Sequence, residues 1–88
     1  MFEKLQSIVG EQLAIVSYDD HVIKLQTTAG WFMLLSGEKL LEVCSSGDLV
    51  DAEITSMVFT VEKGYHKVKI ATDTGNLFGI WNKLHGVY

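Results

Sequence analysis

The chain has 88 residues, which suits one domain spanning residues 1–88, and 48% of them are hydrophobic, which excludes a disordered chain. A single cysteine excludes a disulfide scaffold, and the longest apolar run, residues 31–35, is too short to cross a membrane. The net charge of −4 and the lack of arginine argue against sequence-specific binding to DNA, because arginine is the preferred side chain for phosphate and guanine.

Residues 2–9 are predicted to form a short helix, because their apolar residues recur at helical spacing and Gly10 is a natural stop. The rest of the chain is rich in β-branched and aromatic residues, interrupted by turn signals such as Lys63-Gly64. The predicted extended segments are residues 12–18, 22–28, 31–36, 49–62, 66–72 and 76–81, followed by a tail over 82–88. Residues 38–45 fit a helical turn and a strand equally well.

The predicted fold class is therefore mainly β, bordering on α+β. A short N-terminal helix precedes about six antiparallel strands, which form a curled sheet or a small barrel because small β domains must hide their edges. A weak internal repeat supports this prediction, since residues 23–30 resemble residues 68–75, which lie 45 positions later. The identical pairs are Lys24 and Lys69, Thr27 and Thr72, and Gly30 and Gly75. This favours two repeated three-stranded meanders, although unrelated meanders can share such a pattern.

Apolar residues and glycine together exceed half of the chain, whereas a soluble domain of average composition has about 45–50%. A domain this small buries less of its surface than a large one, so the excess predicts a homodimer or a larger oligomer. The predicted interface is Trp31, Phe32 and Met33, because their segment is apolar on both faces. An unusually apolar monomer surface is the alternative.

Charge is distributed unevenly along the chain. Residues 40–62 contain five acidic residues and no lysine, whereas residues 63–83 are mostly basic. The acidic segment is either an ordinary solvated surface or a face for a basic protein partner, for which the candidate residues are Glu42, Asp48, Asp51 and Glu53. The leading functional prediction is accordingly a non-enzymatic protein-interaction module, located in the cytoplasm because the sequence shows one cysteine and no signal segment.

A small barrel that binds a small ligand or single-stranded nucleic acid is the alternative function. Its residues would be a basic segment with aromatic side chains: Tyr65, His66, Lys67, Lys69 and Trp81. The net negative charge and the lack of arginine weaken this alternative, and a solvated strand guarded by lysines explains the same pattern.

The sequence contains few signs of catalysis. Asp73-Thr74-Gly75 is similar to the triplet of aspartic proteases, but it falls late in the chain, follows Thr72 rather than an apolar residue, and suits a turn between strands. Cys44 could pair with a histidine such as His66 at an oligomer interface, but no local signature supports this. The spacing of histidines and the absence of glycine-rich phosphate loops predict no metal and no cofactor.

Overall fold

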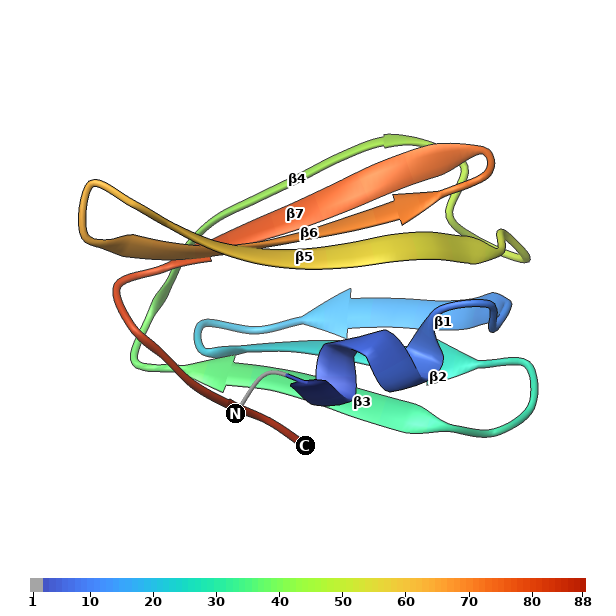
Figure 1. The fold of residues 1–88 in the computed structure, drawn as a ribbon, viewed down its shortest axis with the longest axis horizontal. Coiled ribbons are helices and arrows are strands. Elements are labelled where there is room, and N and C mark those ends of the chain that lie inside the picture. Colours follow the sequence, from blue (N-terminus) through green and yellow to red (C-terminus); the bar gives the residue numbers. More distant parts are fainter. Residues whose placement is uncertain (1–2) are drawn as a thin grey trace.

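The computed structural model describes residues 3–88 and shows two antiparallel sheets stacked as two layers (Figure 1). The chain begins with a short 3₁₀ helix, η1 (Glu3–Ile8), and continues with eight strands. The strands are β1 (Leu13–Tyr18), β2 (Val22–Thr27), β3 (Phe32–Gly37), β4 (Leu40–Gly47), β5 (Ile54–Glu62), β6 (Tyr65–Thr72), β7 (Gly75–Trp81) and β8 (Leu84–Val87).

Each sheet consists of a three-stranded meander and one strand contributed by the other half of the chain. The first sheet has the order β1-β2-β3-β8, and the second has the order β4-β7-β6-β5. Strand β4 follows β3 in sequence but crosses to the second sheet and pairs with β7, while β8 follows β7 and crosses back to pair with β3. The two halves are therefore interlocked.

The core lies between the sheets, because side chains on a strand alternate between its two faces. On β6, Val68 and Ile70 are buried while Lys69 between them is exposed. Trp81 is the largest core residue, is fully buried, and donates its indole N–H to the carbonyl of His21 at 2.9 Å. This bond ties β7 of the second sheet to the β1–β2 turn of the first.

Mainly β architecture is confirmed, but several details of the prediction need correction. There are eight strands among residues 3–88 rather than six, and the two sheets do not close into a barrel. The predicted tail contains β8, and the N-terminal part of the predicted strand 49–62 is a loop up to Glu53. The predicted helix exists as η1, a 3₁₀ helix, and Phe2 at its start lies outside the described residues.

Residues 38–45, which the sequence left ambiguous, belong largely to strand β4. The register of β4 against β7 shifts between Leu40 and Glu42, which marks a β-bulge at Leu41. The extra residue allows Leu40 and Val43 to pack against the same core. Two core contacts three residues apart imitate helical spacing, which explains the ambiguity.

Bulges show how closely the two halves correspond. In the first meander the register shifts between Leu13 and Ile15, and Leu13 lies opposite Thr27. In the second meander the register shifts in the same way after Ile54, which lies opposite Thr72. Leu13 and Thr27 of the first meander are thus equivalent to Ile54 and Thr72 of the second.

Backbone hydrogen bonds between the halves come in matching pairs. Leu13 N–H donates to Ala52 and Ile54 N–H donates to Glu11, both at 2.9 Å. At the other end of the molecule, Glu38 N–H donates to Lys83 at 2.9 Å, and Asn82 N–H donates to Lys39 at 3.2 Å. The last two bonds join the two crossover connections, and they indicate an approximate twofold relation between the halves.

The two tryptophans provide a matched test of this fold. Trp81→Ala should lower the free energy of unfolding by roughly 3–5 kcal/mol, because it empties a core site and leaves the His21 carbonyl without its partner. Trp31→Ala should change it by less than about 0.5 kcal/mol, because the Trp31 side chain is 66% exposed. Urea unfolding of both variants measures the difference, and equal losses would contradict the described core.

Candidate functional site

Five carboxylates gather at one end of the molecule, which we call the acidic end. Its members are Glu11, Asp48, Asp51, Glu53 and Asp73. All are exposed except Glu11, which is half-buried. The segments that carry them, residues 10–12, 47–53 and 73–76, contain no lysine.

The pairing of the two halves places these acids together. Gln12 forms a bridge with Glu53, and its side-chain amide donates to the carbonyl of Asp51 at 2.7 Å. Asp73 N–H donates to the Glu53 carbonyl at 3.1 Å, and Glu53 N–H donates to the Asp73 carboxylate at 3.1 Å. Thr74 Oγ1 donates to the Asp48 carbonyl at 2.9 Å, which attaches the preceding loop to the same end.

Three of the four predicted acidic residues meet at the acidic end, and Glu42 does not. Glu42 lies on β4 opposite Ile80, five residues before Gly47, so it is about 17 Å from the acidic end along an extended strand. Sequence reasoning missed Glu11 and attributed Asp73 only to a turn. Both come from segments distant in sequence from 48–53, so no local pattern could have grouped them.

Cys44 is hydrogen-bonded to an acid rather than to a histidine. Its Sγ donates to Glu42 Oε1 at 3.2 Å. This hydrogen bond, with smaller contributions from burial and from the Glu42 charge, raises the pKa of Cys44. The thiol therefore stays protonated at neutral pH, which is unfavourable for a nucleophile.

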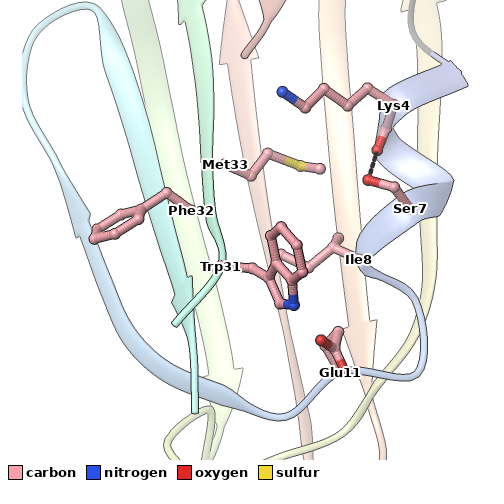
Figure 2. A pocket seen from close by; sticks show the side chains of 7 residues that line it. All are labelled: Lys4, Ser7, Ile8, Glu11, Trp31, Phe32 and Met33. Atoms are coloured by element: carbon pink, nitrogen blue, oxygen red, sulfur yellow. Dashed lines mark hydrogen bonds between the residues drawn. The ribbon is translucent and has the colours of Figure 1, made fainter. Parts of the chain in front are cut away.

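The predicted interface residues lie beside a cleft between η1 and β3 (Figure 2). Trp31 is 66% exposed and Phe32 is 53% exposed, whereas Met33 is 1% exposed and belongs to the core. The Trp31 indole lies across the cleft from η1, and Phe32 points away from it. Trp31 and Phe32 are thus exposed enough to contact another molecule, whereas Met33 is buried at the bottom of the cleft.

The outer faces of the two sheets carry apolar side chains at different positions: Val58 and Ile80 of the second sheet replace Ser17 and Ser36 of the first, whereas the reverse holds at three other positions of the first sheet. These three positions carry the exposed apolar side chains of Ile15, Phe32 and Tyr88. The corresponding strand positions in the second sheet hold Ser56, Asn76 and Cys44. Because the backbone is so similar, the difference arises from side-chain choice, and exposed apolar side chains of this size are candidates for contacts outside the chain.

The residues predicted for nucleic acid or ligand binding are divided between the two faces of the second sheet. Lys67 and Lys69 point outward from the second sheet, where Lys67 lies 4.5 Å from the centre of the Phe78 ring. Trp81 is in the core, and His66 packs edge-on against Phe59 with ring centroids 5.3 Å apart. Tyr65 is exposed and alternates onto the same outer face as the two lysines, so only Trp81 and His66 of the predicted residues lie away from that surface.

His66 has a structural contact of its own. Its Nδ1 accepts a hydrogen bond from the Leu84 N–H at 2.9 Å, so β6 of the second sheet holds the start of β8. Acceptance at Nδ1 requires the tautomer with hydrogen on Nε2. The side chain therefore helps to anchor the strand that completes the first sheet.

Neither a metal site nor a membrane-spanning helix is found in residues 3–88. No group of three or more histidine, cysteine or acidic residues in this range could hold a metal ion, and no helix within it is long and apolar enough to cross a membrane. The Asp73-Thr74-Gly75 triplet forms the β6–β7 turn, in which Thr72 Oγ1 accepts from Gly75 N–H at 2.8 Å.

Comparison of the chain with protein-family models, with curated proteins and with solved structures found no match.

Removal of the His66 ring should weaken the attachment of β8 to the second sheet. His66→Ala leaves the Leu84 N–H without an acceptor and should lower the free energy of unfolding by about 1–3 kcal/mol. His85→Ala is the matched control, with an expected change within about 0.5 kcal/mol because that side chain is exposed and its contact with Glu38 is a surface ion pair. His66→Asn, whose Oδ1 can replace Nδ1, should recover part of the loss in urea unfolding. No recovery would contradict the role of the acceptor.

Proposed function

We propose that this chain is a non-enzymatic protein-interaction module whose acidic end binds a basic segment of a partner protein. The observation that carries the proposal is the convergence of five carboxylates on one end of a rigid two-sheet scaffold, in segments without lysine. A net charge of −4 would not by itself orient a partner. Concentration of negative charge at one end does, because the potentials of neighbouring charges add.

The acidic end is suited to steering rather than to tight burial. Its side chains are largely exposed and remain hydrated, so a basic partner gains attraction at small desolvation cost. The lysines on the outer face of the second sheet, Lys67 and Lys69, lie on a different part of the surface and favour one orientation of approach. Such binding should be fast and sensitive to salt.

Self-association is the second part of the proposal. The apolar outer face of the first sheet, with Phe32 at its centre and Ile15 across Gln26 from it, is the surface that a second copy would cover. Lys24 lies 4.9 Å from the centre of the Phe32 ring and shields only part of it. Because the equivalent face carries Ser56 and Asn76, the fold does not require apolar residues at these positions.

Charge reversal tests the acidic end. The triple variant Asp51→Lys, Glu53→Lys, Asp73→Lys should weaken binding of a labelled octalysine peptide by roughly tenfold or more at low salt. Fluorescence anisotropy measures the affinity between about 10 mM and 150 mM ionic strength, over which the Debye length falls from about 30 Å to 8 Å. The parent chain should lose affinity steeply over this range.

The matched control is Glu38→Lys, Glu42→Lys, Glu62→Lys, which changes the net charge by the same amount at exposed positions away from the acidic end. This control should retain most of the affinity. Equal losses in both triple variants would show that only net charge matters, and the proposed acidic end would be wrong.

Native mass spectrometry over a range of protein concentrations tests self-association. The parent chain should give a dimer or larger oligomer, and Phe32→Asn should shift it to monomer because the apolar centre of the face is lost. Val58→Asn, a half-exposed residue on the outer face of the second sheet, should leave the oligomer intact. A monomeric parent at every concentration would refute this part of the proposal.

A further inference from the structure

Two histidines occupy equivalent positions in the two halves of the chain. His66 is the second residue of β6 and lies opposite Trp81, the last residue of β7. His21 immediately precedes β2, and its carbonyl accepts a hydrogen bond from the N–H of Gly37, the last residue of β3, at 3.0 Å. The twofold relation that superposes Gly37 on Trp81 therefore also superposes His21 on His66.

The two imidazole rings use the same nitrogen in opposite ways. His21 Nδ1 contacts the Glu38 carbonyl oxygen, which can only accept, so this nitrogen donates. His66 Nδ1 contacts the Leu84 N–H at 2.9 Å, which can only donate, so this nitrogen accepts. A ring nitrogen can donate whether the imidazole is neutral or protonated, but it can accept only when the ring is neutral. Of the two equivalent contacts, only that of His66 depends on the charge of the ring.

The first residues of the two exchanged strands show the same contrast. Leu84 of β8 lies opposite Gly37, and Leu40 of β4 lies opposite Trp81, so the two leucines are equivalent. The Leu40 N–H donates to the carbonyl of Asp20 at 2.8 Å, and a backbone carbonyl does not titrate. The Leu84 N–H donates to an imidazole instead. Because Leu84 is buried, loss of this acceptor leaves its N–H without a replacement partner.

The charged side chains of the second sheet around His66 face away from its ring. His66 lies opposite Val61 and packs edge-on against Phe59, on the inner side of the sheet. Its neighbours on β6, Tyr65 and Lys67, alternate to the outer side. The exposed residues Glu62, which lies opposite Tyr65, and Lys63 in the β5–β6 turn complete the charged groups of this region.

The charged groups of the first sheet and of the crossover connections have contacts of their own. The Asp19 carboxylate accepts from the backbone N–H groups of His21 and Val22. His85, the neighbour of Leu84, is exposed, and its Nε2 lies 3.8 Å from Glu38 Oε2. The remaining charged residues at this end are all exposed: Asp20, Lys39 and Lys83. The contacts that the structure shows for the His66 ring are thus with an N–H donor and an apolar ring, neither of which stabilises a positive charge at Nδ1.

We propose that His66 makes the attachment of β8 dependent on pH. Protonation puts hydrogen on both ring nitrogens, so Nδ1–H then faces the Leu84 N–H and the hydrogen bond is lost. Histidine is the side chain whose charge ordinarily changes between about pH 5 and 8. The contact is therefore present at neutral pH and is lost on mild acidification, when β8 opens locally while β4 stays attached through Leu40.

The surrounding hydrogen bonds limit how far the opening spreads. Glu38 N–H donates to Lys83 and Asn82 N–H donates to Lys39, and both acceptors are backbone carbonyls that keep their role at any pH. The opening consequently stops at Lys83. Strand β8 itself has only four residues, so little main-chain pairing opposes its release. This device goes beyond the proposed function, and it is tested without a partner or a second copy.

Amide hydrogen exchange followed by NMR at about pH 7.5 and about pH 5 tests the proposal, with each rate divided by the intrinsic rate at that pH. In the parent chain, protection of the Leu84 amide should fall by about tenfold or more on acidification. Protection of the equivalent Leu40 amide should change by less than about twofold, because its acceptor does not titrate. The chemical shift of the Leu84 amide should follow the same titration midpoint as the His66 ring.

Two variants assign the effect to one ring. His66→Asn supplies an acceptor oxygen that does not titrate, so protection of the Leu84 amide should change by less than about twofold over the same pH range. His85→Asn removes the titrating ring next to Leu84 and should keep the tenfold loss of the parent chain.

Equal protection of the Leu84 amide at both pH values in the parent chain would overturn the proposal, and this measurement needs no variant to fold. The same loss in His66→Asn as in the parent would also overturn it. Disappearance of the loss in His85→Asn would assign the pH dependence to the His85–Glu38 pair, and the role of His66 would then be wrong.

Discussion

The mutual exchange of the fourth strand between the two halves is the constraint on which the structure depends. Neither meander forms a complete sheet on its own, because β4 completes the second sheet and β8 completes the first. The hydrogen bonds of Glu38 to Lys83 and of Asn82 to Lys39 hold the two crossover connections side by side. Since each sheet borrows a strand from the other half, the sheets cannot separate without losing strand pairing as well as core contacts, which favours a single cooperative unfolding unit.

The approximate twofold relation also allows side chains at equivalent positions of the two halves to be compared. Where the two halves carry similar residues at equivalent positions, as with Thr27 and Thr72, the residues serve the turns. Where they differ, neither half is uniformly more apolar: Phe32 and Trp31 stand in place of Asn76 and Gly75, whereas Val58 and Ile80 stand in place of Ser17 and Ser36. The scaffold tolerates both choices, so the exposed aromatic residues of the first half are not explained by folding.

Strand content and the mainly β class could be predicted from the sequence, because β6 alternates clearly and turn residues separate most strands. The two tryptophans could not be distinguished, since both have an apolar neighbour in sequence. Only the register of β3 and β7 shows that Trp81 points into the core and Trp31 lies at its edge. The acidic end was predicted in part, because Asp48, Asp51 and Glu53 are close in sequence. Glu11 and Asp73 join them through backbone pairing between distant segments, which produces no periodic pattern in the sequence.

The interlocked topology also constrains the order of events during synthesis. When the first half leaves the ribosome, β1, β2 and β3 can pair locally, but β4 has no partner until β7 has emerged. The first sheet is completed later still, after residues 84–87 have emerged. A nascent chain of this design exposes two unpaired edges until β8 has emerged, and its native fold then becomes accessible almost all at once. Chaperone occupancy during synthesis should therefore persist until β8 appears.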